Sequence, residues 1–234
     1  MSQVTLNAKA VLAATLIFPA AGVWHADVEV GNGEALASAI GKPMQASLQF
    51  ADVALTGTIL PRGGAYDGRG WFRVVGGANA WGKVVEEKGY RSAAGVKAST
   101  VLGDVARDAG ETLGAFTDFR VGGWYTRAKA EARDVLEDVA GGRWYVDESG
   151  RTQIGARPTQ TWSSSHRLLE ARPDRNWVRI AADSLVGLVP GAQLEGLTAA
   201  SVRHELAGEK LHTTIWGTDG ATPGDRLLQR FAAM

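Results

Sequence analysis

The chain of 234 residues contains no cysteine, and its net charge is zero because 25 Lys and Arg balance 25 Asp and Glu. The lack of cysteine excludes disulfides, thiolate metal sites and cysteine nucleophiles, and it fits a reducing compartment without establishing one. The lack of net charge argues against a broad surface for nucleic-acid phosphates, which requires clustered basic residues. It also leaves little long-range repulsion between copies of the chain.

Long apolar runs are missing too. The longest, residues 10–24, is shorter than the roughly 18 residues that a membrane-spanning helix needs, and Pro19 interrupts it. We therefore expect no membrane-spanning segment. A secretory signal peptide is the alternative interpretation of this run, since Lys9 precedes it and small residues follow Pro19. The long stretch before the run, with one basic residue, argues against a signal peptide.

Glycine (30 residues) and tryptophan (8 residues) are abundant, which suits strands separated by turns. Residues 24–30 alternate strictly, with Trp24, Ala26, Val28 and Val30 on one face. Such alternation predicts a strand with one buried face, and residues 10–18 are its expected hairpin partner. Further strands are expected at residues 46–50, 55–60 and 71–75, and the Gly-rich segment 61–70 is expected to be a loop. Six or so short strands in residues 3–85 predict a barrel or sandwich.

The middle of the chain has helical periodicity. Ser99 or Thr100 is expected to cap a helix that ends at Gly110, and a second helix is expected from Arg127 to Ala140. Strands return after it, in a hairpin at residues 143–154, a strand at 176–181 and segments at 189–197 and 201–216, and residues 225–233 are expected to form a short helix. The fold class predicted is therefore β-rich α+β, with two small barrel or sandwich domains joined by a two-helix segment.

Two glycine-containing segments resemble ligand-binding loops. Residues 28–37 resemble the start of a dinucleotide-binding motif, but Leu36 occupies the place of its third glycine and the strand before it alternates. A simple turn is the better interpretation. The segment from Arg62 to Gly70 could present backbone N–H groups and arginines to a phosphate. No helix follows it, so a loop tip is favoured, and contact with a partner stays open.

The four histidines do not form an obvious site. In the hairpin 201–216, a turn at residues 207–210 places Leu206 opposite Leu211, His204 opposite Thr213 and His212 opposite Glu205. The two imidazoles then point to opposite faces, which argues against a shared metal ion. His166 follows three serines, but neighbouring strand residues face opposite ways and no nucleophile elbow surrounds them.

Acidic residues gather on both predicted helices, and either group could pair as a general acid and base. A solvated helix face is the simpler interpretation of each group. We therefore assign no catalytic, cofactor-binding or metal-binding residue, expect no cofactor, and predict that the chain is not an enzyme. Asp104, Asp108 and Glu111 lie near one face of the first helix, and the second helix carries Asp134, Glu137 and Asp138.

Four segments together resemble the baseplate hub proteins of tailed phages, which connect the tail tube to the central spike. They are residues 189–216, with a Pro-Gly turn followed by SVRHEL and LHTTIW; residues 143–155, RWYVDESGRTQIG; residues 55–59, LTGTI; and residues 68–77, GRGWFRVVGG. Together with the N-terminal part that contains the last two segments, which resembles the first tube domain of that family, they cover about 70% of the chain, and none is a diagnostic motif.

The resemblance implies two tube-type β-barrels per chain, at residues 1–90 and 143–234, with a helical connection at 91–142. It implies a homotrimer whose six barrels form a ring. The ring would contact a tail tube or distal tail protein and a central spike protein, and DNA would pass through it without sequence-specific contacts. The chain would be a virion component of the tail baseplate, synthesised in the host cytoplasm, and would take part in DNA ejection.

Two other functions remain open. One is a six-fold tail ring protein of the distal tail type. The other is a β-sandwich module that binds a carbohydrate or peptide through exposed aromatic rings. Four tryptophans lie in strand patterns that suggest burial, which argues against stacking on sugars. They are Trp24, Trp71, Trp144 and Trp177.

Overall fold

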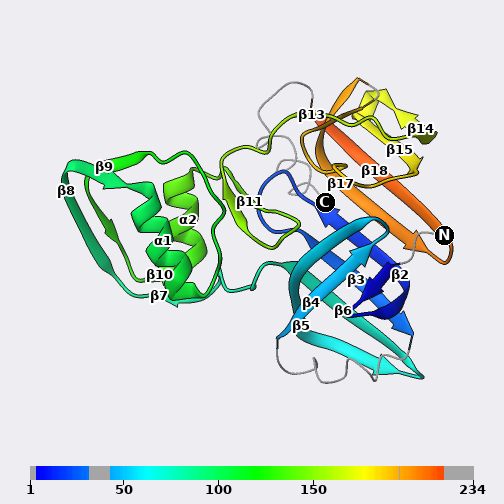
Figure 1. The fold of residues 1–234 in the computed structure, drawn as a ribbon, viewed down its shortest axis with the longest axis horizontal. Coiled ribbons are helices and arrows are strands. Elements are labelled where there is room, and N and C mark those ends of the chain that lie inside the picture. The colour runs from blue at the N-terminus through cyan, green and yellow to red at the C-terminus, as the bar shows by residue number, and fades with distance from the viewer. Residues whose placement is uncertain (1–3, 32–42, 195, 219–234) are drawn as a thin grey trace.

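The computed structural model describes residues 4–31, 43–194 and 196–218 (Figure 1). Within them, one twelve-stranded sheet carries most of the core, and two α-helices with three two-stranded sheets stand beside it. The predicted β-rich α+β class is confirmed. Neither described helix is long and apolar enough to cross a lipid bilayer. The predicted turn at Asn32, the Leu36 segment and the predicted helix at 225–233 lie outside the described residues.

The first six strands form a closed barrel. Their order around the ring is β1-β4-β5-β6-β3-β2, and β1 completes the ring because it pairs with both β4 and β2. The apolar run at residues 10–18 is therefore a barrel strand, paired with the following strand as predicted. The strands are β1 (Val4–Leu6), β2 (Lys9–Phe18), β3 (His25–Gly31), β4 (Met44–Phe50), β5 (Val53–Tyr66) and β6 (Arg69–Gly76).

The predicted loop at residues 61–70 is wrong. The backbone of β5 continues to Tyr66, turns at Asp67 and Gly68, and enters β6 at Arg69. Gly63 pairs with Phe72 and Gly64 with Trp71, beyond a bulge in β5. Glycine-rich composition indicated a loop, but these glycines lie in a paired hairpin, where a bulge increases the twist of the strands.

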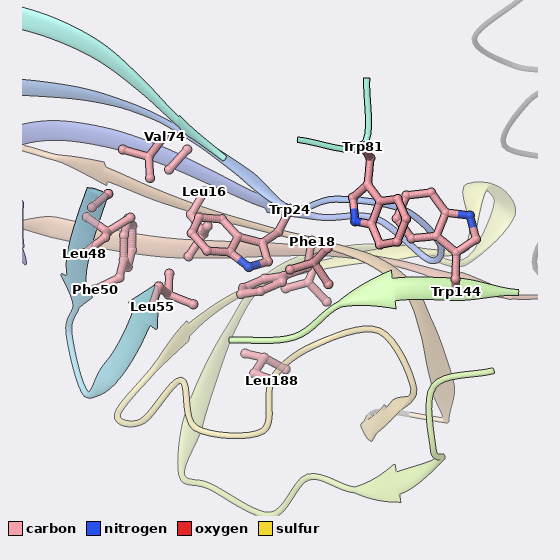
Figure 2. Close-up of a cluster of buried hydrophobic side chains, with 14 of the residues drawn as sticks. Leu16, Phe18, Trp24, Leu48, Phe50, Leu55, Val74, Trp81, Trp144 and Leu188 are labelled. Atoms are coloured by element: carbon pink, nitrogen blue, oxygen red, sulfur yellow. The ribbon is translucent and has the colours of Figure 1, made fainter. Parts of the chain in front are cut away.

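The alternation in and before β3 is confirmed: Trp24, Ala26, Val28 and Val30 are all at most 3% exposed. Figure 2 shows the Trp24 indole beside Phe18, whose ring centroid lies 6.3 Å from that of Trp24. The indole N–H donates to the backbone carbonyl of Asp147 over 2.9 Å, so the polar atom of this buried ring is satisfied. Trp24 therefore packs in the barrel core and also connects the barrel to the segment around Asp147.

Two glycines make room for this indole. A Cβ at Gly76 would lie 2.6 Å from the Trp24 Nε1 atom. A Cβ at Gly57 would overlap the backbone carbonyl oxygen of Val75 and lie 3.0 Å from the Trp24 ring. Close approach of a backbone or ring is a recognised reason for glycine inside a strand.

We expect Gly57→Ala to lower the free energy of unfolding by about 1–3 kcal/mol, because the overlapping oxygen belongs to a paired backbone that cannot move aside. Gly64→Ala is the matched control on the same strand, since nothing lies within 4 Å of a Cβ there. Its effect should stay within about 0.5 kcal/mol. Urea unfolding of both variants measures the difference, and equal losses would contradict this account.

The helical part contains α1 (Ala98–Ala109) and α2 (Ala132–Ala140), which pack together. Their buried residues include Val101, Leu102 and Val105 in α1 and Val135, Leu136 and Val139 in α2. Both end at a left-handed glycine, Gly110 and Gly141, as predicted. The predicted cap of the first helix is wrong. Asp118, from a later loop, accepts hydrogen bonds from the Ser99 N–H (2.9 Å) and hydroxyl (2.8 Å).

The predicted start of the second helix at Arg127 is also wrong. Arg127 ends a strand, and its buried guanidinium donates to Asp108 (2.9 Å) and to the Glu86 carbonyl (2.8 Å). The strands of this part were not predicted, because side chains of the two long ones are exposed on both faces and do not alternate clearly. They are β7 (Val84–Val85), β8 (Lys88–Lys97), β9 (Arg120–Arg127) and β10 (Ala130–Glu131).

The hairpin of β11 (Trp144–Val146) and β12 (Thr152–Ile154) forms where the sequence predicts it. It is attached to the barrel, since Gly22 N–H donates to the Trp144 carbonyl (2.8 Å) and Thr56 N–H to the Glu148 carbonyl (2.9 Å). Figure 2 shows the Trp144 indole beside that of Trp81. The division at residues 90 and 142 stays a prediction.

The remaining strands form a second group of six. The predicted hairpin register is confirmed: His204 pairs with Thr213, Glu205 with His212, and Leu206 with Leu211. Among the described residues, the end strands β13 and β14 do not pair with each other. The strands are β13 (Gln160–Thr161), β14 (His166–Arg172), β15 (Trp177–Ala182), β16 (Ala192–Leu194), β17 (Leu197–Ala207) and β18 (Lys210–Thr218).

The barrel and the second group share one sheet. Strand β2 pairs antiparallel with β17 from Phe18 opposite Val202 to Ala13 opposite Ala207. The order β6-β3-β2-β17-β18-β15-β14 is therefore continuous across the two groups. Figure 1 shows β17 and β18 running beside the barrel strands.

Candidate functional site

The continuous sheet has one side turned toward the cores and one side turned away from them. We call the side turned away the outer face; it consists of the outward side chains of β6, β3, β2, β17, β18, β15 and β14. Residues that pair across antiparallel strands point to the same side. The pairings therefore place Arg73, Asp27, Thr15, Glu205 and His212 side by side in one row.

A second row lies next to the first. It contains His25, Ile17, Arg203, Thr214 and Arg179, again one residue from each of five neighbouring strands. Most of these side chains are half-buried, because they lie against one another on the sheet. The outer face is thus an ordered polar surface built by both strand groups.

Ion pairs hold the part of this face that lies on the barrel. Arg73 binds Asp27 through two hydrogen bonds of 2.7 Å, and Arg69 binds Glu29 over 2.9 Å. The Arg73 hydrogen bonds hold the pKa of Asp27 below its ordinary value, against the opposing effect of burial. Burial lowers the pKa of the neighbouring His25, and the Arg73 charge lowers it further.

On the second group, one carboxylate serves two guanidinium groups. Glu205 lies 2.8 Å from Arg203 Nη2 and 3.5 Å from Arg179 Nη2. The Nε atoms of both arginines and the Nδ1 atom of His212 are shielded from solvent and have no hydrogen-bond partner among the described residues. This cluster therefore has more donors than acceptors.

The basic residues on the outer face outnumber the acidic ones. Every carboxylate there already contacts an arginine, including Glu170, which lies 3.0 Å from Arg172 Nε. Arg167 and Lys210 have no ion-pair partner among the described residues. The basic residues are Arg69, Arg73, Arg167, Arg172, Arg179, Arg203 and Lys210; the acidic ones are Asp27, Glu29, Glu170 and Glu205.

The outer face is also hollowed. An open groove of about 660 Å³ crosses β5, β6, β3, β2 and β17, and its lining includes Thr15, Asp27, Trp71 and Arg73. The predicted burial of Trp71 is wrong: it is 46% exposed, because β6 turns Phe72 and Val74 into the core and Trp71 outward. Trp24 and Trp144 are buried as predicted, and Trp177 is half-buried.

Three of the acidic residues on the helices have ion-pair or hydrogen-bond partners. Asp104 binds Lys88 and Arg107, Asp108 binds Arg127, and Asp138 accepts from the Tyr125 hydroxyl. The expected solvated position of Glu111 is wrong. Its buried carboxylate accepts backbone N–H groups of residues 78 and 80, at 3.2 and 2.5 Å, and burial raises its pKa.

The other candidates are not brought together. His166 lies at the start of β14, where its ring contacts Trp162 and Nδ1 lies 3.1 Å from the Ser164 carbonyl. His204 is buried while His212 is on the outer face, as the register predicted. The Arg62 to Gly70 backbone belongs to a hairpin, so it does not form a phosphate loop. The described residues contain no group of three or more His, Asp or Glu side chains placed to hold a metal ion.

No family model matches the sequence, and no curated protein matches it either. Solved structures do match. The Escherichia coli c3393 protein, a component of the type VI secretion system with structural similarity to the T4 bacteriophage tail proteins gp27 and gp5, has a TM-score of 0.62 at 9% identity, over 94% of this chain and 79% of that chain. The chain shares the fold of this protein.

Two tail proteins also share the fold. The 43 kDa tail protein of prophage MuSo2 from Shewanella oneidensis has a TM-score of 0.57 at 8% identity, over 92% of this chain and 96% of that chain. The tail protein from Neisseria meningitidis MC58 has a TM-score of 0.60 at 11% identity, over 95% of this chain and 98% of that chain. The likeness therefore includes both strand groups and the helical part.

The outer face was not found from the sequence, although its signals are present there. The polar positions of residues 25–29 and of the hairpin 201–216 are visible as alternation. They are joined by the pairing of β2 with β17. These strands are about 190 residues apart in the sequence, so no local pattern predicts that they pair. The net charge of zero also concealed the local excess of basic residues on this face.

Proposed function

We propose that the chain is a structural subunit of a phage-type tail, namely the homotrimeric hub that joins the tail tube to the central spike. The observation that carries the proposal is the match of nearly the whole chain to tail proteins, with a closed barrel followed by a second six-stranded group. Because a fold alone does not determine function, the proposal has to be tested by measuring how many copies of the chain assemble.

The two six-stranded groups support the trimer. Three copies present six such groups in a ring, which fits a six-fold tube on one side and a three-fold spike on the other. A ring of this kind needs heterologous contacts that close by rotation, and three-fold closure satisfies that requirement. The partners proposed are other copies of the chain, a tail tube or distal tail protein, and a spike protein. The ring would form part of the DNA channel of the virion.

A structural role also fits the chemistry of the described residues. Four of the six candidate acids, Asp104, Asp108, Glu111 and Asp138, are bound to arginine, lysine, tyrosine or backbone groups, and none of these four pairs with a nucleophile in a pocket. Such networks stabilise a fold, whereas an active site needs a concave site with groups free to act on a substrate. We therefore propose no enzymatic activity.

Light scattering on the purified full chain tests the assembly. Since one copy weighs 24.7 kDa, a trimer is expected at about 74 kDa and a six-fold ring at about 148 kDa. The six-fold mass would favour a ring of the distal tail type. A chain that stays monomeric at all concentrations, and binds glycans on an array, would favour a carbohydrate-binding module and contradict the hub.

A further inference from the structure

We propose that the outer face is the surface of this chain that binds the phosphodiester backbone of DNA, through the Arg179–Glu205–Arg203 cluster and the groove beside Arg73. The proposal rests on the proposed function, because it identifies which side of the sheet faces the passage of a ring. The outer face is built jointly by the barrel and the second strand group, so it exists only in the folded, joined chain.

The charge of the outer face is the first argument. All four of its carboxylates are already in contact with arginine, so none presents an unpaired negative charge to a ligand. Glu205 neutralises only one of the two guanidinium groups that it contacts, and Arg167 and Lys210 add further positive charge. The local excess of positive charge attracts a polyanion even though the whole chain is neutral.

The donors of the cluster are the second argument. Arg179 and Arg203 flank Thr214 in one row, so about 10 Å separates their strands, twice the spacing of neighbouring strands. Their side chains are 39% and 41% exposed, so a ligand can reach the guanidinium groups, although the Nε atoms themselves are shielded from solvent. Oxygen atoms of phosphate groups are the acceptors that guanidinium groups bind best, together with carboxylates.

The shape of the outer face is the third argument. The groove is open and crosses five strands, and its lining includes Thr15 and the paired Asp27 and Arg73. An open concave surface fits a rod better than a small molecule, since small-molecule sites enclose most of their ligand. Charge contacts on such a surface carry no sequence information, so binding should depend on salt and not on base sequence.

The test compares two double variants of the full chain. Arg179→Ala with Arg203→Ala removes two charges from the outer face, and Arg107→Ala with Arg133→Ala removes two exposed charges from the helices. Fluorescence anisotropy with a labelled linear duplex, titrated from about 50 to 200 mM salt, gives the affinity and its salt slope. The outer-face variant should bind about tenfold more weakly, with a slope smaller by about 2, while the helix variant keeps both values.

Three outcomes would overturn the proposal. The first is an equal loss of DNA affinity in both double variants, and the second is undetectable DNA binding by the wild-type chain. The third is tighter binding of poly-glutamate than of DNA, which would indicate an acidic protein partner. Light scattering on the same samples separates this proposal from the hub. A trimer whose outer-face variant binds DNA normally refutes only the surface, whereas a monomer that shows the expected loss keeps the surface and refutes the ring.

Topology gives a second readout. If the outer face lines a closed ring, a preassembled trimer should bind linear duplex but not a covalently closed circle of the same length, because a closed circle cannot be threaded. Equal binding of the two DNA forms by a stable trimer would place the binding surface outside the ring and overturn the assignment.

Discussion

Trp24→Ala is expected to lower the free energy of unfolding by about 3–5 kcal/mol, the range for removing a fully buried aromatic ring. The indole is 0% exposed, and it lies against the glycines at positions 57 and 76. Those glycines carry no side chain that could move into the cavity, and their backbones are paired between β5 and β6. The substitution also removes the donor for the Asp147 carbonyl, so the contact between the barrel and the β11–β12 hairpin weakens at the same time.

Urea unfolding of three variants tests this expectation. Trp71→Ala is the matched control, because this tryptophan is 46% exposed on the next strand of the same barrel, and its loss should stay below about 1 kcal/mol. Trp24→Phe keeps most of the ring and loses the hydrogen bond, so it should fall between the two. A similar loss for Trp24→Ala and Trp71→Ala would show that the indole does not organise the core.

Acidification is expected to lower the free energy of unfolding by about 3 kcal/mol through His204 alone. Burial lowers the pKa of His204 from 6.5 to about 4, so the imidazole is neutral in the folded chain at neutral pH. The unfolded chain takes up a proton below about pH 6.5, and the folded chain only near pH 4. Stability from this group is therefore complete above about pH 6.5 and is lost as the pH falls to about 4.

The surroundings of His204 explain why protonating it would destabilise the folded chain. Its Nδ1 lies 2.8 Å from the Thr213 hydroxyl, and the rings of Phe18 and Phe50 lie about 6 Å away, at 6.0 and 6.1 Å between centroids. Asp52 is the acidic group whose charge opposes the shift. His204 thus lies where the barrel and the second group meet, and a charge there would be surrounded by apolar side chains.

Unfolding in urea, repeated at several pH values between about 7 and 4, measures this contribution. His204→Gln should reduce the pH dependence in that interval, and the lowered pKa of His25 and the raised pKa of Glu111 should account for what remains. His212→Gln, on the other face of the same hairpin, should preserve the wild-type dependence. The lowered pKa values of Asp27 and Asp104 affect stability below their ordinary value of 3.8, so they act at lower pH than His204. A wild-type profile that is flat from about pH 6.5 to 4 would contradict the prediction.

Local patterns were enough to predict the parts of the fold that depend on neighbours in sequence. The strict alternation of residues 24–30 predicted the buried face of β3, and the turn at residues 207–210 fixed the register of β17 and β18. The apolar stripes of both helices were visible for the same reason, since side chains three and four residues apart share a helix face. Each of these features is determined by residues that lie close together in the sequence.

Features that depend on distant segments were not predictable. Glu111 resembled a solvated acid on a helix face, but the backbone N–H groups of residues 78 and 80 bury it. Asp118 caps a helix that begins before it in the chain. For the candidate site, the sequence showed each polar strand but not the β2–β17 pairing, and therefore not the outer face. Tertiary contacts decide such positions, and single-strand patterns do not contain them.

The double pairing of β2 has a mechanical consequence. This strand is hydrogen-bonded to β3 along one edge and to β17 along the other, with six residue pairs on the β17 side. A pull along the strand direction would load those hydrogen bonds together instead of opening them one after another. The two strand groups should therefore resist sliding past each other along the strand direction.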